Sequence, residues 1–455
     1  MEERGINRLR YRGLLNQLLY KAKDEFEESE AFLIENKEVN ISLYKGEIDK
    51  FSIAESGGLS LRGTRAGRMG YAYTEKIDEE ALDILIEEAS ENRKYIDDKE
   101  PEVIFEGSKS YKSQDNYSQA LEEVGTEEKI NFLKKLEAEA LRLDKRVFSV
   151  NNCGYQEFYQ NRHILNSKGV DLEDRTNGAF AFISVVVKEG EDTKTGLSYR
   201  IVKDFSELDY KKMAKEAVKN ASSMLGAESI KSDNYPIVFE NKTFANFLSA
   251  FSSIFSAENV QKGLSGLKGK LGEDIANPIL TIVDDPFLKD GFASKNFDDE
   301  GTSTQVTKLI DKGKLSSLIY NWKAAKKDKV QSTGNASRSY KGQISISPTN
   351  LYVQKGETEF TGLIDLKEGV FINDLQGLHS GLNPVSGDFS LSAAGFMIED
   401  GQLGKPVNQI TIAGNLYELL KDIEAIGKDL EFSLPGASYI GSPSVRVSSL
   451  SVSGK

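Results

Sequence analysis

The stretches "SGGLSLRGTRAG" (residues 56–67) and "SKGVDLEDRTNG" (residues 167–178) share the pattern Ser-x-Gly-(Leu/Val)-x-Leu, followed by glycine six residues later. Each lies between predicted strands, with a predicted helix before and after. A spacing of 111 residues is too long for a solenoid repeat. The pattern therefore predicts two related helix–strands–helix units in an α/β layer. The predicted elements are helices at 9–26, 78–96, 126–144 and 207–226, strands within 30–74 around a turn at Lys45-Gly46, and a polar stretch at 97–125.

The pattern changes from residue 235 onward. "YPIVFE" predicts a short buried strand, and phenylalanines at spacings of three and four predict a helix over 243–256. Short alternating runs then follow, separated by Gly, Asp-Gly and Asn-Pro. We expect a helix at 415–429 to pack on these strands. The fold class is predicted as α+β, with an N-terminal α/β unit at 1–110, a related unit at 111–230 and a β-rich C-terminal domain at 231–455.

Composition limits the class of protein. A hydrophobic fraction of 39% and a charged fraction of 28% are ordinary for a globular chain and argue against wholesale disorder. No apolar run reaches the ~18–20 residues of a membrane span, and the N-terminus lacks the apolar core of a signal peptide. We therefore expect a cytoplasmic protein with no membrane contact. The net charge of −13 opposes attraction to phosphate backbones, so we expect no nucleic-acid partner.

Few residues are available for metal or nucleophile chemistry. Cys153 is the single cysteine, which excludes a multi-thiolate metal site, and the histidines are His163 and His379. The sequence has no phosphate-binding glycine motif and no Gly-x-Ser-x-Gly. The acidic runs Asp284-Asp285 and 298–300 are typical of turns, and we expect structural roles for them. No cofactor is predicted.

Two loops suit ligand binding. "QSTGNASRSYKG" (331–342) offers hydroxyls, an amide and a guanidinium that match a peptide main chain or a carboxylate. "GLHSGLNPVSGDF" (377–389) is rich in loop-forming residues. A plain surface turn explains the first loop equally well, and a hydrogen-bonding role explains a lone histidine in the second. The candidate peptide-binding residues are Ser332, Thr333, Gly334, Asn335, Arg338, His379, Ser386 and Asp388.

Several motifs, taken in order, resemble the TldD/PmbA family, whose members were formerly described as modulators of DNA gyrase. They are "LRGTRAGRMGYAYT", "FDDEGTSTQ", "STGNASR", "HSGLNPVSGDFS", "ITIAGNL" and "SPSVRVSSLSVSG". The similarity spans essentially the whole chain. It implies an α/β N-terminal region, a β-rich C-terminal domain and two subunits that pair around a peptide-binding channel.

The resemblance also implies a departure from the catalytic members. TldD-type members are zinc metalloproteases with a His-Glu-x-x-x-His helix and a cysteine ligand near the C-terminus. Matching the glycine loop "GLSGLKGKLGE" (263–273) without gaps places those three positions near Leu248, Ser249 and Ser253. None is a zinc ligand, and "PGASYIGSPS" contains no cysteine. A catalytic zinc needs about three protein ligands, so the chain resembles the PmbA/TldE branch, with no metal expected.

The sequence therefore predicts a non-zinc subunit that acts with a TldD-type zinc protease subunit on small peptides and is not catalytic alone. The alternative is a homodimeric peptide-binding or scaffold protein without enzymatic function. A gyrase-associated role rests only on the family's older name, and it would require a basic face that this charge balance does not favour.

Overall fold

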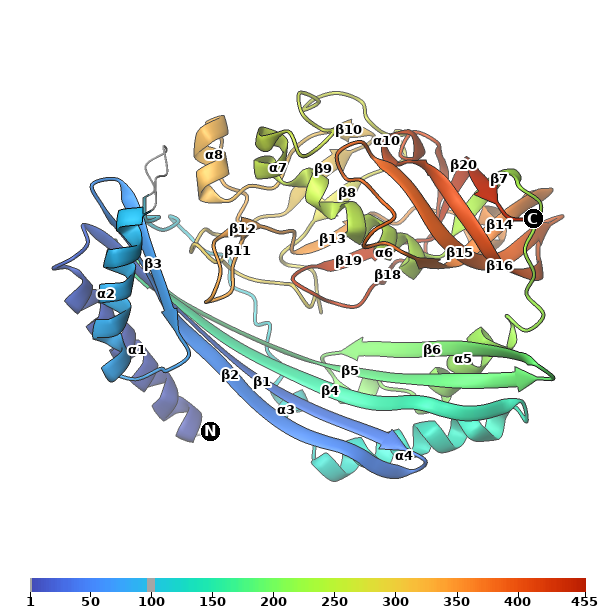
Figure 1. The fold of residues 1–455 in the computed structure, drawn as a ribbon, viewed down its shortest axis with the longest axis horizontal. Coiled ribbons are helices and arrows are strands. Elements are labelled where there is room, and N and C mark those ends of the chain that lie inside the picture. Colours follow the sequence, from blue (N-terminus) through green and yellow to red (C-terminus); the bar gives the residue numbers. More distant parts are fainter. Residues whose placement is uncertain (1, 96–102) are drawn as a thin grey trace.

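The N-terminal half is built on one antiparallel sheet. The structure is a computed structural model that describes residues 2–95 and 103–455. The sheet has the order β3-β2-β1-β4-β5-β6, and four longer helices accompany it (Figure 1). The elements are α1 (Glu2–Ala22), β1 (Glu28–Tyr44), β2 (Glu47–Arg65), β3 (Arg68–Thr74), α2 (Glu80–Tyr95), α3 (Gln119–Glu122), α4 (Thr126–Leu143), β4 (Val147–Asn166), β5 (Asp171–Glu189), β6 (Asp192–Val202) and α5 (Tyr210–Ser222).

The predicted duplication is confirmed at the level of elements. Each unit runs helix, three strands, helix, and the units meet where β1 pairs antiparallel with β4. The alignment of the two Ser-x-Gly stretches is wrong, because residues 56–65 lie inside β2 whereas residues 167–170 form the turn between β4 and β5. The turns that correspond are Lys45-Gly46 and Lys168-Gly169, where Gly46 and Gly169 have φ of +78° and +95°. Both turns need the left-handed backbone that glycine adopts without strain.

Strand alternation gives the sheet two different faces. Odd-numbered residues of β1 point into the cores beneath the helices: Leu33 packs with α1 and α2, and Ile41 packs with α4 and α5. Even-numbered residues point the other way, and Phe32 packs against Phe297 of the C-terminal domain. Since side chains alternate with a period of two, the same strands serve the helix layer and the domain contact. Figure 1 shows the long sheet curving beneath the C-terminal domain.

The C-terminal domain is β-rich, as predicted. One sheet has the order β16-β15-β14-β7-β20-β17, and an additional pairing of β16 with β20 makes it close on itself. A second sheet has the order β10-β9-β8-β13-β19-β18. β11 and β12 form a separate pair. The strands of the whole domain are β7 (Asp233–Phe239), β8 (Ile282–Asp284), β9 (Thr307–Asp311), β10 (Lys314–Leu315), β11 (Ala336–Ser337), β12 (Ser345–Ile346), β13 (Asn350–Val353), β14 (Glu368–Gln376), β15 (Asp388–Glu399), β16 (Gln402–Asn415), β17 (Ile423–Ile426), β18 (Glu431–Phe432), β19 (Tyr439–Ser442) and β20 (Val445–Ser453).

Short helices complete the domain. They are α6 (Asn241–Phe251) with its 3₁₀ continuation (Ser252–Phe255), α7 (Ala257–Lys262), α8 (Trp322–Asp328), α9 (Phe360–Leu363) and α10 (Leu416–Leu419). The phenylalanine stripe of α6 lies in the main core, as its spacing predicted, with Phe244, Phe247 and Phe251 fully buried. None of the helices in the described residues is both long and apolar enough to cross a membrane.

The helix predicted over 415–429 is wrong. Only Leu416–Leu419 is helical, and Ile423–Ile426 forms β17, in which Ile423 lies opposite Val447. The apolar spacing there suits a helix, but pairing with β20 overrides it, because local propensity is weaker than tertiary contacts. Of the predicted polar stretch at 97–125, residues 97–102 lie outside the described residues.

Candidate functional site

The loop predicted to bind peptide is largely built into the domain. Thr333 and Asn335 are 5% and 1% exposed. The Thr333 hydroxyl donates to the carbonyl of Tyr320 and accepts from its backbone N–H, and Ser332 Oγ donates to the same carbonyl. Asn335 Nδ2 donates to Asp284 Oδ2 at 2.7 Å. These polar groups therefore have acceptors and donors within the chain.

Arg338 already has a carboxylate partner. Its Nη2 lies 2.6 Å from Glu30 Oε1 on β1, and its guanidinium lies 4.3 Å from the centre of the Phe32 ring. Glu30 also accepts from Arg62 Nε of β2 at 2.8 Å. Burial opposes ionisation of Glu30, but Arg62 and Arg338 outweigh it and hold the pKa of that carboxyl below its usual value. The guanidinium predicted to bind a substrate carboxylate is thus paired with one of the chain's own.

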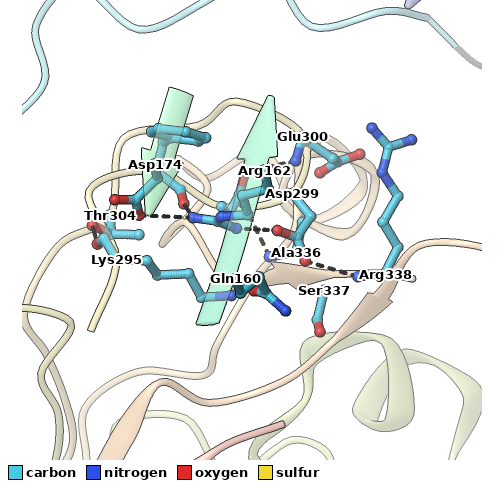
Figure 2. Close-up of polar contacts among 12 residues, drawn as sticks. Gln160, Arg162, Asp174, Lys295, Asp299, Glu300, Thr304, Ala336, Ser337 and Arg338 are labelled. Carbon is cyan, nitrogen blue, oxygen red and sulfur yellow. Dashed lines mark hydrogen bonds and ion pairs between the residues drawn. The ribbon is translucent and has the colours of Figure 1, made fainter. Parts of the chain in front are cut away.

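A second buried ion cluster joins the other unit to the same domain. Arg162 of β4 pairs with Asp299 and lies 3.2 Å from Asp174 of β5, and its Nη2 donates to the carbonyl of Phe297. Figure 2 shows Arg162 between the two carboxylates. Burial opposes ionisation of Asp299, but Lys295, Arg162 and the backbone N–H of Arg338 lower its pKa. We call the residues Glu30, Arg62, Arg162, Asp174, Asp299 and Arg338 the ionic junction.

The acidic run at 298–300 is therefore structural, as expected, but it is buried rather than a surface turn. Asp298 accepts three backbone N–H bonds, from Glu300, Thr302 and Ala336. Burial and the neighbouring Glu300 raise the pKa of Asp298 to about 7. Glu300 accepts from the backbone N–H of Trp322, and burial raises its pKa as well. Asp284 is equally buried and accepts from the backbone N–H and the hydroxyl of Thr349.

The helix matched to the metalloprotease motif presents hydroxyls. Leu248 is 3% exposed and packs in the core, whereas Ser249 and Ser253 face outward. Ser252 Oγ donates to the carbonyl of Ser249 at 2.8 Å. Hydroxyl groups and an alkyl side chain do not form the N, S or carboxylate donor set that zinc takes from proteins. The residues at these positions therefore do not fit a zinc ion.

Histidine and cysteine do not supply a set elsewhere in the described residues. No group of three or more His, Cys, Asp or Glu side chains there is placed to hold a metal ion. His163 is buried with Nε2 2.8 Å from Asp171 Oδ1, and Cys153 is buried, which raises the pKa of its thiol. His379 is exposed in the loop between β14 and β15.

The second predicted loop meets the glycine loop through a residue that the sequence did not single out. Tyr417 Oη accepts from the backbone N–H of Gly266 at 3.0 Å and donates to the carbonyl of Pro384 at 3.1 Å. Asn415 Nδ2 donates to the carbonyl of Ser386 and to Asp388 Oδ1. A Cβ at Gly266 would lie 2.6 Å from the Tyr417 ring, so glycine is needed for this approach. We call this contact the Tyr417 junction.

The Tyr417 junction connects to the serine-bearing helix. Ser265 Oγ in the glycine loop donates to the carbonyl of Ile254, at the end of the 3₁₀ continuation of α6. Ile319 then pairs with the backbone around Ser256, and the next residue, Tyr320, accepts from the 332–333 hydroxyls. The structure thus brings α6, the glycine loop and the 383–388 loop together, and the 332–335 loop is hydrogen-bonded to the buried residue Tyr320. His379 lies further along the exposed hairpin.

Three family models match the chain in sequence order. The "PmbA/TldA metallopeptidase domain 1" matches residues 29–93, the central domain matches 119–225, and the C-terminal domain matches 232–454. The chain belongs to the PmbA/TldD metallopeptidase family. The predicted resemblance is therefore confirmed.

Individual family members match over nearly their full length. An uncharacterized protein of Methanocaldococcus jannaschii is 31% identical, with 91% of this chain and 96% of that protein covered. The metalloprotease PmbA of Escherichia coli O157:H7 is 25% identical, with 86% of each covered. The crystal structure of TldE from Thermococcus kodakarensis superposes with a TM-score of 0.90 at 25% identity, covering 97% of this chain and 100% of that one.

One more perturbed group at the base of α6 was not predicted. Glu240 precedes the helix, and burial raises its pKa to about 7, with Lys242 and Thr243 opposing the shift and Glu216 and Asp429 adding to it. No local motif marks it, because burial is the largest cause of the shift and the carboxylates that add to it come from α5 and from the segment after β17. This PmbA/TldD member therefore has a carboxyl group with a pKa near neutral pH, at the point where the second unit meets the C-terminal domain.

Proposed function

We propose that this chain is a metal-free, PmbA/TldE-like subunit of a TldD/TldE-type metalloprotease complex that helps bind and process small peptides. The observation that carries the proposal is the helix α6, where Leu248 is buried and Ser249 and Ser253 are exposed at the positions matched to the zinc motif. Peptide hydrolysis at neutral pH requires an activated water, so the zinc and the general base would come from a TldD-type partner. A cytoplasmic location belongs to the same proposal.

Peptide contact is proposed at the exposed members of the predicted set. His379, Ser386 and Asp388 are accessible, and the Tyr417 junction fixes Ser386 and Asp388 beside the glycine loop. The buried members, Thr333, Asn335 and Arg338, would hold the domain in shape rather than touch substrate. A loop anchored at its base leaves backbone groups free to bind an extended peptide.

The proposal is tested by mixing the purified chain with a zinc-bearing TldD-type subunit from the same organism. We expect no stoichiometric zinc and no peptidase activity in the isolated chain, and peptidase activity when the two are combined. Stoichiometric zinc with activity in the isolated chain would contradict the proposal. Failure to form a mixed complex, together with a stable homodimer, would favour the scaffold alternative.

The Tyr417 junction gives a matched pair of variants for the same assay. Tyr417→Phe removes the hydroxyl that joins the two loops, and we expect kcat/KM of the mixed complex to fall by about tenfold, corresponding to one or two lost hydrogen bonds. Tyr20→Phe removes a hydroxyl from a side chain that is 73% exposed on α1, and it should leave kcat/KM unchanged. Equal kcat/KM for both variants would argue against a role of this junction in the reaction.

A further inference from the structure

The first half of β2 has an unoccupied outer edge. Its pairing with β3 covers only Leu59–Arg65, and within the described residues no strand pairs with the outer side of residues 47–56. We call residues 47–56 the bare edge. It carries three large exposed apolar side chains: Ile48, Phe51 and Ile53 are 47%, 47% and 55% exposed.

These side chains form one row on the helix-covered face of the sheet. Ile48, Phe51 and Ile53 lie opposite Leu43, Ile41 and Val39 of β1, and all three β1 residues belong to the core beneath α4 and α5. The apolar core therefore continues outward past α4 and ends in solvent at β2. An added strand on this edge would extend a buried layer that already exists.

The second unit shows how the corresponding edge is protected. β6 pairs with β5 only from Ala179 onward, so Asp171–Gly178 of β5 pair with β4 on one side and, in the described residues, with no strand on the outer side. The segment 114–118 lies along this gap: Asn177 exchanges two hydrogen bonds with the backbone of Ser118, at 2.7 and 2.8 Å, and Arg175 stacks over the ring of Tyr117. Asn177 is fully buried. The duplicated units thus differ in that one edge is covered by its own chain and the other is bare.

Exposed strand edges invite pairing, and proteins usually interrupt them with proline, charge or a bulge. The bare edge has a bulge at Asp49, where the pairing with β1 shifts by one residue. Beyond it, the run Phe51–Ala54 has no charge, proline or glycine. Residues 50–56 therefore offer a regular ladder of free backbone groups together with two apolar side chains on one face.

We propose that the bare edge accepts an extended strand of the catalytic partner subunit, so that the sheet continues from one subunit into the other. That this edge is a docking surface is inferred from the fold. That the occupant is the catalytic subunit rests on the proposed function. The strand that fits has apolar side chains opposite Phe51 and Ile53, followed by Lys or Arg opposite Glu55. Aromatic or β-branched cross-strand pairs and opposite charges are the contacts that stabilise such a ladder.

A second copy of this chain fits the edge poorly. An antiparallel pairing centred on Ile53 uses the whole regular ladder but places each Phe51 opposite Glu55 of the copy. The register that pairs Phe51 with Ile53 instead brings the bulge at Asp49 against Glu55, so that two carboxylates meet. Glu55 already has Lys37 at 3.7 Å on its inner side, and like charges directly opposite destabilise a ladder. A strand of different sequence avoids both conflicts.

The test combines binding and hydrogen exchange with the zinc-bearing TldD-type subunit of the same organism as the probe. Ile53→Lys places a charge in the apolar row, and we expect it to raise the Kd of the mixed complex by about tenfold or more. Ile84→Lys makes the same change at a side chain that is 58% exposed on α2, and it should leave the Kd unchanged. Amide exchange at residues 47–56 should slow when the wild-type chains are mixed.

Each of three other outcomes would overturn one part of the proposal. If the wild-type chains bind, yet Ile53→Lys binds equally well and exchange at 47–56 does not change, the edge is not the docking surface, while the proposed function stands. If exchange at 47–56 already slows with concentration in the isolated chain and Ile53→Lys abolishes the effect, the occupant is a second copy. If the wild-type chains do not bind at all, the proposed function itself is overturned.

Discussion

The two duplicated units share a topology but differ in how they are held. The first unit contributes Glu30 and Arg62 to the ionic junction and leaves half of β2 bare. The second contributes Arg162 and Asp174 to the same junction, meets Glu240 and Lys242 at the base of α6, and has its outer edge covered by segment 114–118. In the described residues, the second unit therefore has the outer edge of β5 covered by its own chain, whereas the first unit has residues 47–56 of β2 without a covering segment.

Removing Glu30 from the ionic junction, which joins the first unit to the C-terminal domain, should have the largest effect on stability. Glu30→Ala removes the carboxylate that both Arg62 and Arg338 contact, although Arg62 keeps a longer contact of 3.9 Å with Glu300. Removing one partner of a buried pair costs about 3–5 kcal/mol. We expect the free energy of unfolding to fall by that amount in urea titrations. Glu55→Ala removes an exposed pair with Lys37 and should change it by less than about 0.5 kcal/mol. Equal losses in the two variants would refute an anchoring role for the junction.

The contribution of Glu240, which lies where the second unit meets the C-terminal domain, should make stability depend on pH. Burial raises the pKa of Glu240 in the folded chain to about 7, above the ordinary value of 4.5 for a glutamate. Its contribution to stability is therefore complete below pH 4.5 and is lost as the pH rises through 7. Relative to Glu240→Gln, the wild-type chain should lose up to about 3 kcal/mol of unfolding free energy between pH 4 and pH 8. Parallel stability curves for the two proteins would show that this carboxyl ionises normally in the folded state.

Loosening segment 114–118 from the edge of β5 should make that edge exchange its amide hydrogens as the bare edge of the first unit does. Asn177→Ala deletes both hydrogen bonds to Ser118 and leaves that backbone without its partners, at a cost of about 2 kcal/mol. Amide exchange at 171–178 should then approach the rate measured at 47–56. Thr176→Ala removes one longer contact, of 3.4 Å to the carbonyl of Asn116, and serves as the milder control. Unchanged exchange in Asn177→Ala would mean that another contact protects this edge.

The smallest effect is expected at the bare edge of the isolated chain. Phe51→Ser should change the free energy of unfolding by less than about 0.5 kcal/mol, because the side chain is already half in solvent. Its cross-strand neighbour Ile41 is 2% exposed, and Ile41→Ser should cost several times more, since it places a hydroxyl in the core. A large loss from Phe51→Ser would show that this side chain supports the isolated fold.

Much of the fold was readable from periodicity, because the sheet strands and their helices carry strong apolar patterns. The repeat offset and the helix at 415–429 were wrong for a shared reason. Short motifs and short apolar runs do not encode strand register or pairing partners, and it is pairing with β20 that makes Ile423–Ile426 a strand. Helix α6 was predicted correctly, since its phenylalanine spacing agrees with its core position.

The site was less predictable. The hydroxyls and Arg338 in the 331–342 loop suggested a ligand surface, yet their partners are Tyr320, Asp284 and Glu30, which lie 12 to 308 residues away. A single sequence carries no signal for such distant pairs. Tyr417 likewise looked like an ordinary helix residue, and only the approach of Gly266 to its ring reveals its position between two loops.

The separation of Glu30 from Arg338 also bears on how the chain folds during synthesis. Their ion pair spans 308 residues of sequence, so β1 and β2 stay without this cation until three quarters of the polypeptide has been made. Contacts of such high sequence separation form slowly, because a long loop must close before they gain energy. At about 5–20 residues per second of synthesis, the buried carboxylate of Glu30 waits tens of seconds for Arg338. During that interval Glu30 has only the guanidinium of Arg62 beside it out of its two ion-pair partners, and for most of it Phe32 on the same face is not yet covered by Phe297 of the C-terminal domain.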